Sequence, residues 1–215
     1  MLTHILHNSP SLCTFIEHLQ LPLSQPQLQH VRNLADAVLV CDAPKTLAAW
    51  QRQFVECVDV SNMADTLRIA PWTAADLHQP VGTFLLRDAL AQARADGTLK
   101  FICISLDDSL TTKHKHTRHL EGVDWHYDHT ASTPHQPHFK NGLAYLGCNV
   151  WVGNLAFTFD VQPYLREKTV RRLNRHRRPD ARLSFRSKLH MARPMLCALH
   201  DLLPTDVPVY VLHDT

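Results

Sequence analysis

Phe101-Ile-Cys-Ile-Ser-Leu-Asp107-Asp108 is the stretch that decides the fold, read together with Val207-Pro-Val-Tyr-Val-Leu-His-Asp214. Each is a short apolar run that ends on an acid, a pattern typical of a strand covered on both faces of a sheet. If the two strands are parallel neighbours, both acids lie at the same edge. Clustered carboxylates of this kind hold the two divalent ions, about 4 Å apart, of phosphoryl-transfer enzymes. The alternative is that each acid simply begins a solvated loop.

Two further strands are predicted between these runs. The segments 143–152 and 155–161 are strand-like, and only Gly153-Asn154 separates them. Gly-Asn is a recognised two-residue hairpin turn, because glycine adopts a positive φ without strain. A helical pattern then begins after Ser187, which is a plausible N-cap. The predicted order over residues 99–215 is strand, two-stranded hairpin, helix and strand, which is an α/β organisation.

Residues 1–98 are predicted to form a separate helical N-terminal domain. Proline and glycine divide the region into short segments, and the apolar residues of the clearest segment recur at helical spacing. That segment has one apolar face, made of Leu28, Val31, Leu34, Ala35, Val38 and Leu39. Periodicity alone indicates a small helical bundle and nothing sharper.

The composition is that of a globular protein able to bury a core, with 45% hydrophobic and 20% charged residues. No apolar run approaches the roughly 20 residues of a membrane span, so no membrane partner is expected. The first residues lack the features of a signal peptide, and a cytoplasmic location is the default expectation. The six cysteines are scattered without a C-x-x-C pair, which predicts neither a disulfide framework nor a cysteine zinc site.

Positive charge is concentrated in the second half of the chain. Between Arg166 and Arg193 there are 11 basic side chains and two acids, Glu167 and Asp180. This stretch is the candidate surface for a polyanion, although a charge run is often a solvated face. Its densest part consists of Arg171, Arg172, Arg175, Arg177 and Arg178.

Histidines crowd one polar segment between Thr111 and Lys140. A transition-metal site is one interpretation, because imidazole binds zinc, copper and nickel, but the spacing matches no closed zinc pattern. A solvated loop near the active site, with Lys113 and Lys115 touching DNA phosphates, is the other. The segment contains His114, His116, His119, His126, His129, His135 and His138.

Several of these segments together resemble insertion-sequence DDE transposases, which have an RNase H-like catalytic core. Leu106-Asp107-Asp108-Ser109, followed by Thr112-Lys113-His114-Lys115-His116 and the region 122–128, resembles the first catalytic motif. Val209-Tyr-Val-Leu-His-Asp214 resembles the second motif. Segments resembling the helical N-terminal region of that family are Pro44-Lys45-Thr46 and Ile69-Ala-Pro71-Trp72.

The resemblance implies a DNA transposase that cleaves and transfers strands with Mg²⁺ or Mn²⁺. Asp107 would be the first metal-binding acid and Asp214 the second. Asp108 is the alternative to Asp107, because neighbouring strand residues face opposite sides. The expected partner is DNA, both transposon ends and target, with residues 1–98 as a DNA-binding domain. The oligomeric state stays open, and a homodimer is one alternative.

The third catalytic acid of the family is a glutamate that follows the second aspartate. The printed sequence has no position for it after Asp214, while Glu121 and Glu167 come before that residue. The expectation is therefore an incomplete RNase H-like domain, in a truncated and inactive transposase fragment. A non-catalytic DNA-binding or interaction fragment is the alternative from another functional class. A histidine-rich metalloprotein is the third.

Overall fold

The computed structural model describes residues 4–42, 46–56 and 59–213. The chain divides into two compact units, Met1–Phe84 and Leu85–Thr215. The division falls within helix α5 (Ala75–Ala95), and not at the predicted position between residues 98 and 99. The reason is that the second half of α5 packs into the core of the second unit through Leu86, Ala89 and Ala93.

The first unit is helical, as the sequence predicts. Its helices are α1 (Pro10–His18), α2 (Gln25–Val40), α3 (Leu47–Gln51), α4 (Val60–Arg68) and the first part of α5. Its core joins α1 to α2 and α5 around the buried side chains of Ile16, Leu19 and Leu21. None of the helices that the structure describes combines the length and the apolar character needed to cross a membrane.

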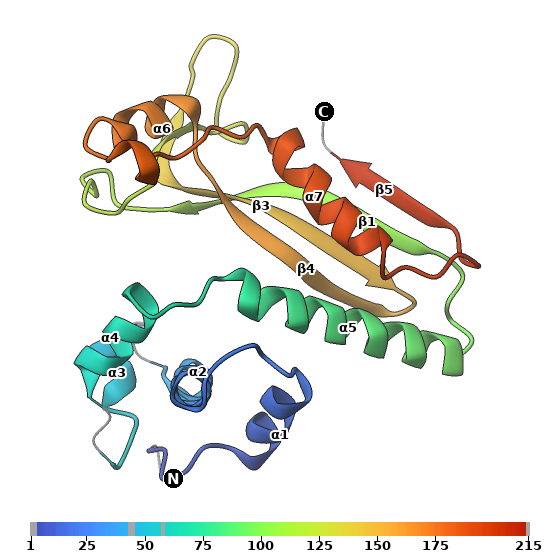
Figure 1. Ribbon diagram of the computed structural model, residues 1–215. Coiled ribbons are helices and arrows are strands. Elements are labelled where there is room, and N and C mark those ends of the chain that lie inside the picture. Colours follow the sequence, from blue (N-terminus) through green and yellow to red (C-terminus); the bar gives the residue numbers. More distant parts are fainter. Residues whose placement is uncertain (1–3, 43–45, 57–58, 214–215) are drawn as a thin grey trace. The chain divides into compact units, whose positions relative to one another are not determined.

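The second unit is built on a five-stranded mixed sheet (Figure 1). The strands are β1 (Ile102–Thr112), β2 (Asp124–Tyr127), β3 (Phe139–Val152), β4 (Leu155–Tyr164) and β5 (Val209–His213). β3 pairs antiparallel with β1, β2 and β4, and β5 pairs parallel with β1 on the other side. The protein is therefore a mixed α/β structure, as predicted, with β2 as a strand that the sequence pattern did not indicate.

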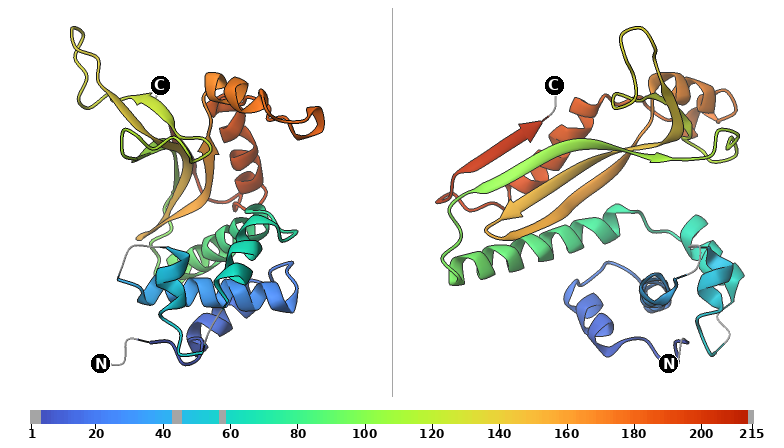
Figure 2. Two further views of the ribbon diagram at one scale, coloured as in Figure 1. Left: turned by 90° about the vertical axis from the view of Figure 1, so that its left-hand side faces the viewer. Right: turned by 180° about the vertical axis from the view of Figure 1, so that it is seen from behind.

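One face of this sheet is covered by helices. After β4 come α6 (Glu167–Asn174), a short 3-10 helix (Pro179–Ala181) and α7 (Lys188–His200). Seen from behind in Figure 2, α7 lies behind the strands, and no helix of the described part of this unit covers the near face. The core between α5, α7 and the sheet includes the fully or almost fully buried side chains of Leu86, Ile104, Val150, Met195 and Leu199.

The first acidic strand is longer than expected. β1 was predicted to end at Asp107, but it continues to Thr112. The continuation is possible because β3 has 14 residues and pairs with β1 as far as Gly142. What does stop near the acids is β5, whose last described pair is Leu106 with His213.

The predicted hairpin is confirmed. β3 and β4 are joined at Gly153-Asn154, and Gly153 has φ +58°. A Cβ atom at this position would also lie 2.5 Å from Thr98 Oγ1 and 3.0 Å from Ala93 Cβ. Both the backbone conformation and the close neighbours therefore require glycine.

Replacing Gly153 with alanine is expected to lower the free energy of unfolding by about 1–3 kcal/mol, because a non-glycine residue is strained at positive φ and Thr98 must move. Urea denaturation followed by circular dichroism measures the change. Gly147→Ala in β3 is the matched control, since its nearest neighbours would lie 3.7 Å from the added Cβ. Equal losses in both variants would contradict this account of the turn.

Candidate functional site

Asp107 and Asp108 lie on β1 at the point where the pairing with β5 ends. Leu106 is buried and pairs with His213, the last residue of β5. Both aspartates are exposed, because β1 has no described neighbour on that side beyond this pair. Asp214, predicted to be the second metal-binding acid, lies outside the described residues.

The two aspartates have different partners. Nζ of Lys188, the first residue of α7, lies 2.6 Å from Asp108 Oδ1 and 5.6 Å from the ring centre of Tyr164. Asp107 accepts a hydrogen bond of 2.8 Å from the backbone N–H of Asp108, and among the described residues it has no ion-pair partner. The Lys188 ammonium thus compensates the charge of Asp108, whereas no described cation is paired with Asp107.

A pocket of about 430 Å³ opens beside these aspartates. It brings together side chains from β1, β3, β5, α7 and the loop after β2. Its lining combines apolar side chains with carboxylate, ammonium and imidazole groups. The lining residues are Leu106, Asp107, Asp108, His129, Leu146, Lys188, Leu189, Ala192 and His213.

The described residues offer little for a metal by themselves. Within 4–42, 46–56 and 59–213 there is no group of three His, Cys, Asp or Glu side chains placed to hold an ion. Asp107 provides one hard oxygen ligand, and Mg²⁺ commonly takes only one or two carboxylates and fills its other positions with water and phosphate oxygens. Asp107 is thus a single carboxylate donor of the kind that Mg²⁺ takes.

A buried carboxylate connects β2 to α6. Asp124 is almost fully buried, and it accepts hydrogen bonds from the Thr169 hydroxyl and, at 2.7 Å, from the Trp125 backbone. Lys168 Nζ lies 3.2 Å from Oδ1, the oxygen that also accepts from Trp125, while Thr169 donates to Oδ2. Burial by itself would raise the pKa of Asp124, but these hydrogen bonds and the Lys168 charge outweigh it and hold the pKa below its usual value.

Two other groups of the β2 region have shifted pKa values. The hydrogen bond from Lys140, whose Nζ lies 2.7 Å from Asp128 Oδ2, lowers the pKa of that carboxyl. Burial, together with the charge of Arg166, lowers the pKa of His126. His126 is therefore neutral at pH 7, and it faces α6 with Asp124 because the two alternate with outward residues on β2.

The predicted DNA-binding arginines divide into two groups. Arg172 donates a hydrogen bond of 3.0 Å to the Val123 carbonyl, and Arg177 pairs with Glu121, so both hold the loop before β2. Arg171 pairs with Glu167 at 2.6 Å on the surface of α6. Arg175 and Arg178 are exposed and have no ion-pair partner within the described part of the chain. The last two are the arginines of this cluster that are available to a phosphate.

Lys113 and Lys115 lie in the loop that follows β1. The buried Asn141 side chain donates hydrogen bonds to the backbone carbonyls of His114, at 2.9 Å, and Thr117, at 3.1 Å. Lys115 is exposed and Lys113 half-buried, and neither has a carboxylate partner in the part of the chain that the structure describes. The loop is therefore anchored by its backbone while both ammonium groups stay available.

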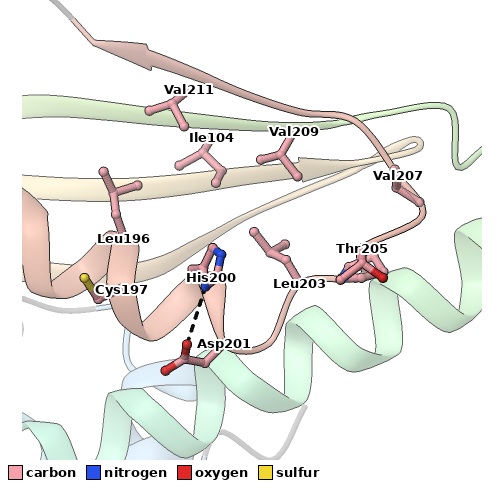
Figure 3. A pocket seen from close by; sticks show the side chains of 11 residues that line it. Ile104, Leu196, Cys197, His200, Asp201, Leu203, Thr205, Val207, Val209 and Val211 are labelled. Carbon is pink, nitrogen blue, oxygen red and sulfur yellow. Dashed lines mark hydrogen bonds and ion pairs between the residues drawn. The ribbon is translucent and has the colours of Figure 1, made fainter.

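A larger pocket, of about 650 Å³, lies between α7, the segment after it and β5 (Figure 3). Its walls are mostly apolar, with Ile104, Val209 and Val211 from the sheet and Leu196 from α7. His200 and Asp201 form a polar pair on its rim, with 3.5 Å between Nδ1 and Oδ1. An apolar wall of this kind does not suit a phosphate.

Two residues of the acidic pocket, Lys188 and His213, were not singled out from the sequence, whereas His129 belongs to the histidine segment that was expected near the active site. Lys188 directly follows Ser187, the correctly predicted N-cap, whose Oγ accepts from the His190 N–H. The signal that could have indicated Lys188 is its position as the first residue of α7, a helix that packs on the apolar face of the sheet. Its pairing with Asp108, 80 positions away in the printed sequence, depends on the packing of α7.

No protein-family model, no curated protein and no solved structure shows detectable similarity to this chain.

Proposed function

We propose that residues 85–215 form an RNase H-like domain of the DDE transposase type, in which Asp107 takes part in metal-dependent cleavage and transfer of DNA strands. The observation that carries the proposal is the strand order β4-β3-β1-β5, with β1 antiparallel to β3 and parallel to β5. In this order β1, which carries Asp107, lies between β3 and β5, and β5 belongs to the segment that resembles the second motif. Neighbouring parallel strands end at the same edge of a sheet, which is one way to bring together the carboxylates that two-metal phosphoryl transfer uses.

The pocket chemistry supports the same proposal. Asp107 is an exposed carboxylate without an ion-pair partner among the described residues, and Asp108 is paired with Lys188. This favours Asp107 over Asp108 as the group that holds Mg²⁺ or Mn²⁺. Such an ion would supply positive charge to the phosphate at the cleaved bond. Lys188 and His213 also line this pocket, so an ammonium and an imidazole group lie in the same lining as Asp107.

Binding of Mn²⁺ to the 215-residue chain tests the proposal. Asp107→Asn is expected to weaken binding at least about tenfold, since loss of even an indirect partner of a metal ligand costs that much. Asp108→Asn should have a smaller effect because Asp108 is paired with Lys188. Electron paramagnetic resonance of free Mn²⁺ measures the affinity.

Asp96→Asn is the matched control, because Asp96 is exposed, belongs to the same unit and does not line the pocket. Affinity that is unchanged in Asp107→Asn, or no Mn²⁺ binding by the original chain, would refute the metal-binding role. If Asp108→Asn alone removed binding, the ligand would be Asp108.

A non-catalytic DNA-binding protein is the second candidate function. The observation that favours it is that Arg175 and Arg178, which follow α6, are exposed and have no ion-pair partner among the described residues. DNA binding that depends strongly on salt, without any Mn²⁺ binding, would support this candidate over the first.

A further inference from the structure

An exposed aromatic face lies on the ribbon formed by β2 and the start of β3, and it consists of Trp125, Tyr127 and Phe139. Tyr127 pairs directly with Phe139 across the ribbon, and Trp125 is two residues before Tyr127 on the same strand. Asp124 contacts α6, so the alternation of strand residues turns the aromatic face away from that helix. The three side chains are 44%, 42% and 52% exposed, respectively.

The rings are arranged in a row that ends at the acidic pocket. The rings of Tyr127 and Phe139 meet edge to face with their centres 5.7 Å apart. On the other side, Tyr127 meets His129 with a separation of 4.8 Å, also edge to face. His129 lines the pocket of Asp107 and Lys188. A molecule bound along this row would therefore reach the pocket.

The surroundings of the aromatic face favour an anionic ligand. The three acids of the segment 113–140 are neutralised, since Glu121 pairs with Arg177, Asp124 with Lys168, and Asp128 with Lys140. Among the described residues, the cations of the same segment that have no carboxylate partner are Lys113, Lys115 and Arg118.

The loop that carries these cations lies beside the aromatic face. Asn141 pairs with Trp125 across the ribbon, and its side chain binds the backbone of His114 and Thr117. Cross-strand partners share a face, so the loop is held on the side of Trp125.

Exposed rings beside free cations form the type of surface that binds single-stranded nucleic acid. Bases stack on aromatic side chains while cations follow the backbone, and the binding tolerates any sequence because every base has a π-face. Bases within a duplex are stacked on one another and offer no free face. We propose that the aromatic face binds unpaired nucleotides of a DNA strand that continues into the Asp107 pocket. The continuation of the strand into the Asp107 pocket rests on the proposed function.

Binding of a fluorescein-labelled oligothymidylate of about 20 nucleotides, longer than one binding site, tests the proposal. Fluorescence anisotropy is measured with the 215-residue chain in the presence of EDTA. The double variant Tyr127→Ala/Phe139→Ala is expected to bind the single strand at least about tenfold more weakly, because stacking on each ring is lost. Binding to a duplex of the same length should change much less.

Phe101→Ala/Tyr210→Ala is the matched control. These rings also meet edge to face, with centres 5.9 Å apart, and are 51% and 57% exposed, but they lie at the other end of β1 and on β5. This control should bind the single strand like the original chain, and circular dichroism should show both variants folded. Equal affinity in both variants, an equal loss for duplex and single strand, or no binding by the original chain would overturn the proposal.

Trp125 provides a second readout. A base stacked on its ring quenches its fluorescence, and Trp125→Phe keeps an aromatic ring while removing this signal. Quenching by oligothymidylate should therefore decrease in the variant while binding persists. Quenching of the same size in Trp125→Phe would place the bound bases elsewhere. Because EDTA removes divalent ions, the result is independent of Mn²⁺ binding at Asp107, and either proposal can fail without the other.

Discussion

Replacing Leu199 with alanine is expected to lower the free energy of unfolding by about 2–5 kcal/mol. Leu199 has no exposed surface and belongs to the core between α7 and the sheet, together with Ile104 and Val150. Truncation to alanine removes buried apolar surface and leaves a cavity that the surrounding side chains fill only partly. Urea denaturation followed by circular dichroism, with one fitted slope for both proteins, measures the loss.

Leu189→Ala is the control on the same helix. Leu189 is 78% exposed, so its truncation should change stability by less than about 0.5 kcal/mol. Similar losses at Leu189 and Leu199 would mean that α7 packs with a different face. The comparison therefore tests the placement of the helix that brings Lys188 to Asp108.

Asp124→Ala is expected to lower the free energy of unfolding by about 1.5–3 kcal/mol, the range for hydrogen bonds to a charged group. The main loss is the pairing with Thr169, whose hydroxyl is left buried without an acceptor. The ion pair with Lys168 contributes less, because the Lys168 side chain is more than half exposed and water screens its charge. Asp96→Ala, at an exposed position, should stay within about 0.5 kcal/mol.

The same carboxylate predicts a dependence on pH. The folded-state pKa of Asp124 lies below its unfolded value, so its stabilising contribution is present above the unfolded pKa of about 3.9. This contribution is lost as the pH falls through the lower, folded-state pKa. Thermal unfolding between pH 6 and pH 3 should therefore show a weaker dependence on pH in Asp124→Ala than in the original chain. Parallel curves would mean that Asp124 does not titrate with a lowered pKa; Asp128, whose pKa is also lowered, remains in both proteins.

Local sequence determined the turns and caps correctly. Gly153-Asn154 predicts the hairpin, because glycine alone adopts the positive φ without strain, and Ser187 predicts the start of α7, because its hydroxyl accepts a backbone hydrogen bond. These features depend on residues that are close in the chain. The helical character of the first unit was predictable for the same reason.

The sequence was less informative about where strands end and where the boundary between the two units lies. The run after Phe101 predicted a strand but not its continuation to Thr112, which depends on the length of β3. The short strand β2 has a mixed pattern, and its pairing with β3 places it in the sheet. The boundary between the units lies within α5 and not after it, because Leu86, Ala89 and Ala93 belong to the core of the second unit.

The sequence by itself determined that two apolar runs are each followed by an acid and that cations dominate a segment between these runs, since both are properties of local composition. Tertiary structure alone decided which groups meet. It paired Asp108 with Lys188, left Asp107 without an ion-pair partner in the described part of the chain, and used Arg172 and Arg177 to hold a loop. The physical reason is that contacts between side chains far apart in the chain depend on strand register and helix packing, which local patterns do not contain.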